Sequence, residues 1–319
     1  MITFGPVPSR RLGRSLGINN IPPKHCSYSC VYCQVGRTSH MQTQRQAFYD
    51  PKEVYGEVAE KVRKLQQEGI KIDYLAFVPD GEPALDVNLG KQIELLKPLG
   101  VRIAVISNAS LIWQKEVQDD LCKADLISLK IDAVSEDIWR RIDRPHKSLQ
   151  LGRILQGISG FSSFYKGDLI TETMLIRDIN DTSEEAEKTA RFIAEIKSLK
   201  SYISTPIRPP SEKEIKSADE HAINTAYQIF RGKNINVECL IGYEGNEFAF
   251  TGDAEENLFS IMSVHPMREE AVRQFLKRSG KDWSFVEKTI DENKLEKIEY
   301  GNEIFYMRKF SKSGSRKDK

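Results

Sequence analysis

Short apolar runs alternate with amphipathic stretches from about residue 14 to about residue 241. The runs with β-strand character cover residues 15–18, 72–78, 101–107, 126–132, 169–176 and 202–205. Strands that alternate this regularly with helices are typical of βαβ units and a parallel sheet, either open or closed into a barrel. The pattern therefore predicts an α/β fold for the larger part of the chain.

Helix start and stop signals fall between these runs. Residues 50–53 (Asp-Pro-Lys-Glu) form a capping box with proline at the first helical position. Gly69 is well placed to end the helix that follows. Asp181 with Glu184 repeats the start signal ahead of another amphipathic stretch, so both segments are predicted to be helical.

The pattern changes after about residue 255. We expect a helix from His265-Pro266, a second helix over 283–292, and strands over 295–300 and 303–307. Gly301-Asn302 separates the two strands, as in a two-residue β-hairpin. The order helix, helix, hairpin predicts a winged-helix-like domain at 255–310 after a core domain at 1–245. Residues 311–319 read as a disordered basic tail.

Composition places the chain among globular proteins outside the membrane. It has 319 residues, of which 39% are hydrophobic and 29% charged. No apolar run approaches the roughly 20 residues that span a bilayer. The N-terminus has no charged region followed by an apolar core, so no secretory signal is expected. These features predict a cytoplasmic protein.

The first 49 residues contain no acidic side chain, although the net charge of the whole chain is only +1. The basic side chains there are Arg10, Arg11, Arg14, Lys24, Arg37 and Arg45. Such a block either surrounds an anionic cluster, holds an anionic substrate, or is a solvated basic loop.

Cysteine usage points to metal chemistry. The chain has five cysteines, and Cys26, Cys30 and Cys33 lie within eight residues of one another. An odd number with this clustering disfavours a disulfide scaffold. Cys122 and Cys239 fall in amphipathic stretches and are expected to be buried in the core.

Thiolates suit iron–sulfur clusters and zinc. A structural zinc site needs four ligands, so His25 or His40 would have to complete it. Three cysteines alone would leave one metal position of a cluster open for chemistry. Both kinds of centre stay possible from the residues themselves.

The cysteine spacing, after a basic segment and the first predicted strand, resembles the radical S-adenosylmethionine (radical SAM) superfamily. The resemblance implies a partial (β/α)6 TIM-like barrel. It also implies that the thiolates of Cys26, Cys30 and Cys33 bind three irons of a [4Fe–4S] cluster. The fourth iron would chelate the amino and carboxylate groups of S-adenosylmethionine (SAM).

A second motif supports the same family. Asp80-Gly81-Glu82-Pro83 follows the second predicted strand and resembles the Gly-Gly-Glu-Pro turn that accepts hydrogen bonds from the SAM amino group. A glycine allows close backbone approach, and a carboxylate suits an ammonium group. Here Asp80 replaces the first glycine.

Polar residues at the predicted strand ends complete the implied SAM site. The candidates are Tyr32, Asn108, Ser128, Lys130, Asp132 and Arg208. Ser128, Lys130 and Asp132 share one face of the fourth strand, where unpaired polar groups are costly. The alternatives are an internal ion pair for Lys130 and Asp132, a core aromatic role for Tyr32, and a surface linker role for Arg208.

Residues 5–13 and 34–38 resemble a branch of single-cluster iron–sulfur oxidoreductases often grouped with the tRNA wyosine-base synthetases. The resemblance implies that a reduced cluster cleaves SAM to methionine and a 5′-deoxyadenosyl radical, which abstracts hydrogen from a substrate. It also implies an electron donor such as ferredoxin or flavodoxin. The substrate would be a tRNA, a peptide or a cofactor precursor, with the C-terminal domain as a possible macromolecular contact.

Two readings from other classes compete with an enzyme. One is a zinc- or Fe–S-binding winged-helix regulatory protein without SAM chemistry. The other is a non-catalytic scaffold for cluster assembly. The regulatory protein would leave the polar residues on the fourth predicted strand unexplained.

Overall fold

A computed structural model describes residues 2–240, 255, 258–259, 261–262, 266–300 and 303–309. Its main sheet has eight strands in the order β1-β2-β5-β6-β7-β8-β9-β10. Their bounds are β1 Thr3–Ser9, β2 Gly13–Ile18, β5 Tyr74–Phe77, β6 Arg102–Ser107, β7 Leu126–Lys130, β8 Asp168–Met174, β9 Lys200–Ser204 and β10 Val237–Leu240. β1 pairs with β2 in antiparallel fashion, and every later pair is parallel.

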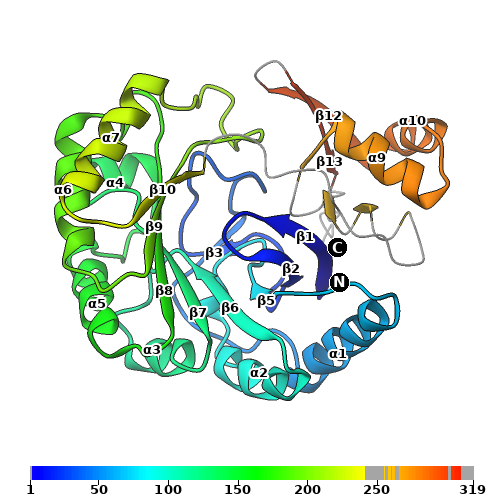
Figure 1. The fold of residues 1–319 in the computed structure, drawn as a ribbon, viewed down its shortest axis with the longest axis horizontal. Helices are drawn as coiled ribbons and strands as arrows, with labels where there is room; N and C mark the ends of the chain where they lie inside the picture. The colour runs from blue at the N-terminus through cyan, green and yellow to red at the C-terminus, as the bar shows by residue number, and fades with distance from the viewer. Residues whose placement is uncertain are drawn as a thin grey trace, which may run out of the picture.

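Helices cover the outer face of the sheet, which curls into a partial barrel (Figure 1). They are α1 Pro51–Gln67, α2 Leu89–Leu96, α3 Lys115–Leu121, α4 Glu136–Ile142, α5 Leu151–Phe164, α6 Ser183–Ala194 and α7 Glu220–Gly232. Alternation along each strand sends one set of side chains to these helices and the other into the barrel. Leu75 and Phe77 thus join the outer core, while Ala76 packs inside with Leu126 and Tyr202. The predicted α/β partial barrel is confirmed.

The six predicted strands all coincide with strands of the sheet, although their ends differ by a few residues. β10 extends the parallel series beyond them, and β1 adds an antiparallel edge that the apolar pattern did not predict. β1 contains Gly5, Pro6 and Pro8. Proline removes a ladder donor, which confines it to edge strands and hides such a strand from a pattern search.

Both predicted helix starts correspond to helices of the structure. The Asp50 side chain accepts a hydrogen bond from the Lys52 amide at the start of α1, and Gly69 follows its end with φ of +70°. The second start signal is displaced by one residue, because Thr182 rather than Asp181 caps α6. The Asp181 carboxylate instead accepts a hydrogen bond from the Asp178 amide in the preceding turn.

From residue 266 onward, the described part of the chain contains two helices and a small sheet of order β11-β13-β12. The elements are β11 Met267–Arg268, α9 Glu269–Ser279, α10 Ser284–Asp291, β12 Leu295–Tyr300 and β13 Glu303–Arg308. The helix expected from His265-Pro266 therefore begins at Glu269, because Met267 and Arg268 pair with β13. Phe4 and Val7 of β1 belong to the hydrophobic cluster of this unit.

Some predictions fall outside the described residues. These are the boundary between 245 and 255, the turn Gly301-Asn302 and the tail 311–319. The domain division, the winged-helix assignment and the tail accordingly stay predictions. Within the described part of the chain, no helix is long and apolar enough to cross a membrane.

The two isolated cysteines differ from each other. Cys239 is half-buried and packs against the main core. Cys122 is exposed, so its predicted burial is wrong. It follows Val117 and Leu121, the buried face of α3, and one further residue turns the side chain about 100° away from that face.

Candidate functional site

The loop that carries the three clustered cysteines starts at a short parallel bridge between β3 His25–Cys26 and β4 His40–Met41. The Cys33 amide donates to the Cys30 carbonyl at 3.1 Å, and the Gly36 amide donates to the Cys33 carbonyl at 3.1 Å. These successive turns bring Cys26, Cys30 and Cys33 into one compact loop. All three thiols are free and half-buried.

Burial keeps these thiols protonated when they carry no metal. It raises the pKa of the Cys26 thiol to about 12 and the pKa of Cys30 well above its ordinary value. The pKa of Cys33 is also raised, although the Lys24 charge opposes the effect of burial. Because metal ligation requires thiolates, a bound metal would have to supply the charge that displaces these protons.

No three His, Cys, Asp or Glu side chains in the described segments converge closely enough to hold one metal ion. A mononuclear zinc site built from the cysteines and His25 or His40 thus gains no support. The two histidines instead stack on each other, with ring centroids 4.4 Å apart.

The Asp80-Gly81-Glu82-Pro83 turn lies directly against the cysteine loop. A Cβ on Gly81 would lie 1.8 Å from the His25 carbonyl oxygen, so only glycine fits there. The Glu82 carboxylate is 1% exposed and accepts hydrogen bonds from the Ala84 and Asn108 amides and from the Ser107 hydroxyl. Its side chain therefore ties the turn to the end of β6, and Pro83 begins the short 3₁₀ helix Pro83–Leu85.

Asp80 and Lys24 carry buried polar atoms that the described protein does not satisfy. Asp80 is 4% exposed and its Oδ1 has no hydrogen-bond partner, and neither has Lys24 Nζ. Burial raises the pKa of Asp80 to about 7 and lowers the pKa of Lys24. Buried polar atoms without partners are rare and indicate a missing ligand or water. Both lie beside Cys33, so they fit a polar cofactor next to a cluster.

A cavity of about 340 Å³ opens between this loop, the β1–β2 turn and the ends of the strands. Five of the predicted site residues line it, namely Tyr32, Cys33, Asp80, Lys130 and Arg208. The others that were predicted do not line it: Cys26, Cys30, Gly81, Glu82, Pro83, Asn108, Ser128 and Asp132. The volume lies in the range of small-molecule sites.

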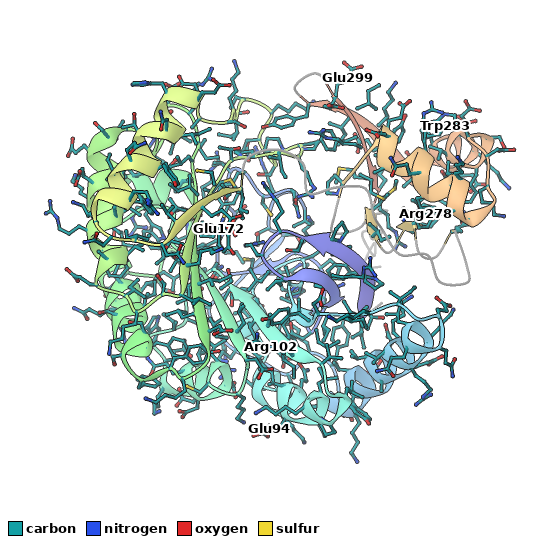
Figure 2. All side chains as sticks on the ribbon, in the orientation of Figure 1. Glu94, Arg102, Glu172, Arg278, Trp283 and Glu299 are labelled. Atoms are coloured by element: carbon teal, nitrogen blue, oxygen red, sulfur yellow. The ribbon has the colours of Figure 1, made fainter. Side chains whose placement is uncertain are left out.

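Charged side chains in the cavity wall, together with Asp132 behind it, form a continuous network. Lys130 Nζ lies 3.2 Å from Glu172 Oε1 and 3.7 Å from Asp132 Oδ1. Arg11 also pairs with Glu172, while the Tyr32 hydroxyl donates to Asp132. Figure 2 shows Glu172 on the inner side of the curled sheet. The internal ion pair that was the alternative for Lys130 and Asp132 is therefore present, and Lys130 lines the cavity as well.

The remaining predicted residues have distinct surroundings. Asn108 Nδ2 donates to Cys26 Sγ at 3.5 Å and to Ser27 Oγ at 3.0 Å. Ser128 is buried, and its hydroxyl has no partner among the described residues. Arg208 is 7% exposed and donates to Gln34 Oε1, so it is not a surface linker residue.

Comparison with known proteins shows the family. The pattern described as the radical SAM superfamily matches residues 20–193, more than half of the chain. The chain belongs to the radical SAM superfamily. It is also 50% identical over 310 residues to the UPF0026 protein MJ1312 of Methanocaldococcus jannaschii, which covers 96% of both chains.

Solved structures agree on the fold. TYW1 with a bound lysine–pyruvate adduct matches 69% of this chain and 73% of that chain, with a TM-score of 0.52 at 18% identity. Streptococcus suis SuiB bound to its precursor peptide SuiA matches 72% of this chain and 52% of that chain, with a TM-score of 0.53 at 13% identity. At these identities the likeness concerns the barrel fold alone.

Membership defines the class of chemistry. Radical SAM proteins use a [4Fe–4S] cluster and SAM, and they need a source of electrons, so this chain is an enzyme of SAM-cleaving radical chemistry. The alternatives without SAM chemistry, a regulatory protein and an assembly scaffold, are therefore wrong.

Several residues around the cysteine loop and the cavity had no clear sequence signal. Cys30 Sγ donates to Asp143 Oδ1 at 3.2 Å, and Ser204 Oγ donates to Glu172 Oε1 at 2.9 Å. Arg10 and Arg11 line the cavity, and the absence of acidic residues before residue 50 was the only pointer to them.

Proposed function

We propose that Cys26, Cys30 and Cys33 hold a [4Fe–4S] cluster at one end of the cavity, and that the chain reductively cleaves SAM there. The observation that carries this proposal is the 340 Å³ cavity, which reaches from Cys33 to the polar strand ends. When bound, the cluster and SAM supply a 5′-deoxyadenosyl radical that removes a hydrogen atom from the substrate.

Residues beside the cluster loop provide contacts for the polar groups of SAM. Asp80 offers a buried carboxylate oxygen to an ammonium group, and Lys24 offers a buried ammonium to a carboxylate. Arg208 lines the cavity with Asp80 and adds a second cation. Gly81 keeps the turn close enough to the loop for these contacts.

Residues at the strand ends hold the rest of the ligand. The Tyr32 ring lies 4.9 Å below Lys130 Nζ and lines the cavity, so it presents an aromatic surface suited to a nucleobase. Asp132 holds the Tyr32 hydroxyl, and its other oxygen accepts from the Met174 amide. These two hydrogen bonds of Asp132 fix the orientation of the Tyr32 ring. Asn108 donates to the Cys26 sulfur and orients that ligand.

The substrate class is open among tRNA, a peptide and a cofactor precursor. The C-terminal unit lies at the rim of the cavity, since the Tyr300 hydroxyl donates to the carbonyl of Pro206, which lines it. A unit at the rim favours a substrate large enough to touch both parts. SuiB, which shares the fold, was solved with a peptide.

The test is anaerobic reconstitution with iron and sulfide, followed by reduction and addition of SAM. We expect cluster absorbance and 5′-deoxyadenosine from the wild type, and neither from Cys26→Ala, Cys30→Ala or Cys33→Ala. Cys122→Ala is the matched control, because that thiol is exposed and far along the chain from the loop. Cleavage that survives loss of the three cysteines would overturn the proposal.

A further inference from the structure

The outer side of the cysteine loop is covered by three segments, 37–43, 144–148 and 211–216, which we call the loop face. Arg37 and Arg144 from two of them both bind the Glu212 carboxylate of the third, at 2.6 and 2.7 Å. Thr43 and Ser148 hydroxyls lie 3.3 Å apart. The three segments therefore form one continuous surface.

The loop face also contacts the backbone of the cysteine loop directly. The Ser211 hydroxyl donates to the Cys30 carbonyl at 3.0 Å, and the His146 amide donates to the Ser27 carbonyl at 2.8 Å. The Ser29 amide donates to the Arg144 carbonyl at 3.2 Å. Any molecule seated on the loop face is thus separated from the cysteines by only the loop itself.

The exposed charge of the loop face is strongly positive. Its exposed cations are Arg37, Arg144, Lys147, Lys213 and Lys216. Within these three described segments the only exposed acid is Glu214, since Glu212 is buried beneath the two arginines. A concentration of one sign of charge on a small area attracts a partner of opposite charge and speeds its encounter.

An exposed apolar side chain lies within this charged surface. Met41 is 38% exposed, and it is paired with Cys26 in the β3–β4 bridge. Met41 is therefore the loop-face residue that is the register partner of a clustered cysteine. Exposed methionine provides an adaptable contact for a partner protein.

No residue of the loop face lines the cavity. A substrate has to reach the cavity, because the radical acts on an atom there. A partner on the loop face can exchange electrons with the cluster without entering the cavity. The position thus favours an electron carrier over an RNA or peptide substrate.

We propose that the loop face is the docking site of an acidic one-electron carrier protein of the ferredoxin or flavodoxin class. The inference rests on the proposed cluster site. In the step concerned the reduced carrier loses one electron and the oxidised cluster gains it, and no bond or proton changes place. In this proposal the five cations contact acidic side chains of the carrier, and Met41 contacts the middle of the carrier's docking surface.

The experiment compares two triple variants of the reconstituted protein. Lys147→Glu/Lys213→Glu/Lys216→Glu reverses charge on the loop face. Lys97→Glu/Lys166→Glu/Lys197→Glu reverses the same charge at exposed positions before β6, β8 and β9, at the opposite ends of the strands. Formation of 5′-deoxyadenosine is measured with dithionite and with reduced flavodoxin, each at low and high salt, and flavodoxin affinity is measured by calorimetry.

We expect the loop-face variant to lose at least about tenfold in flavodoxin-driven rate and in affinity at low salt. Its dithionite-driven rate should match that of the wild type, and the control variant should match in every assay. Equal flavodoxin rates and affinities for both variants would overturn the docking site. An unchanged flavodoxin rate together with weakened binding of tRNA, measured by the same calorimetry, would overturn it as well and assign the face to RNA.

The two proposals fail separately. Absence of dithionite-driven cleavage in the wild type overturns the proposed function, whatever flavodoxin does. Flavodoxin affinity is read without turnover, so it tests the loop face in either case. Matching thermal unfolding midpoints for the three proteins establish that charge reversal has not changed the fold.

Discussion

Lys130 on β7 and Glu172 on β8 are register partners in the parallel sheet, and Lys130 Nζ lies 3.2 Å from Glu172 Oε1 inside the barrel. Their side chains are 16% and 8% exposed. The pair links β7 and β8 where they line the cavity. Because both charges are shielded from water, each would be destabilised without the other.

Removing both members should therefore cost less than the sum of removing each one alone. We expect Glu172→Leu to lower the free energy of unfolding by about 3 kcal/mol, because Lys130 and Arg11 lose their shared carboxylate. Lys130→Met/Glu172→Leu should lose less than the sum of the single variants. Urea denaturation of the three variants measures the difference, and strictly additive losses would contradict the coupling.

An exposed ion pair provides the comparison. Lys188 and Glu184 lie four residues apart on α6, with Nζ and Oε1 2.6 Å apart and both side chains exposed. Glu184→Gln should leave the free energy of unfolding nearly unchanged, because water screens the exposed pair. A similar loss there would show that Glu172 owes its effect to something other than burial.

Glu212 predicts a pH-dependent contribution to stability. Arg37, and then Arg144, lower the pKa of this carboxyl below its ordinary value. A lowered pKa means stability that is present above the unfolded pKa of about 4.3 and lost as pH falls through the folded value. Both arginines are exposed, so solvent screens the pair, and we expect Glu212→Gln to cost only about 1 kcal/mol at pH 7.

Unfolding curves of wild type and Glu212→Gln from pH 7 to pH 3 measure this contribution. The gap between them should close as the pH falls below about 4. Glu214→Gln is the matched control, since this neighbouring carboxylate is exposed. A gap that stays constant with pH would mean that lost packing, not charge, causes the effect.

The local parts of the fold and site were predictable from sequence because they depend on short spacings. The capping residue Asp50, the left-handed Gly69 and the Cys26–Cys33 loop each depend on neighbours a few residues away. The helix that starts at Glu269 was misplaced because its first residues are drawn into a strand by β13, which comes more than thirty residues later.

The cavity wall was only partly predictable, because its contacts join distant residues. Lys130 stood out as a polar residue in a buried strand, but its contact with Glu172 depends on strand register. Asp143 accepts a hydrogen bond from Cys30 although the two residues are 113 positions apart, and no sequence motif predicts that contact. Glu82 belongs to a motif that the sequence did reveal, but the partners of its carboxylate were not predictable. That carboxylate accepts hydrogen bonds from protein donors and does not line the cavity.

Asn108 predicts a shift in the reduction potential of the cluster proposed at Cys26, Cys30 and Cys33. Its side-chain amide donates to Cys26 Sγ at 3.5 Å, and hydrogen bonds to cluster sulfurs raise the reduction potential. Asn108→Ala should lower the potential by about 40 mV, the equivalent of one hydrogen bond of about 1 kcal/mol. A redox titration followed by electron paramagnetic resonance measures it. Asn236→Ala, on the exposed approach to β10, should leave the potential unchanged, and an equal shift in both variants would contradict the assignment.

Gly81 gives a steric test of how the turn supports the cysteine loop. Because an added Cβ would lie 1.8 Å from the His25 carbonyl oxygen, Gly81→Ala must push the backbone next to Cys26 away. We expect a loss of about 2–3 kcal/mol in unfolding free energy and a lower iron content after reconstitution. Gly56→Ala in α1 meets nothing within 4 Å and should instead stabilise the protein by about 0.5–1 kcal/mol. Full iron content in Gly81→Ala would show that the loop tolerates displacement and that the close contact is not what positions Cys26.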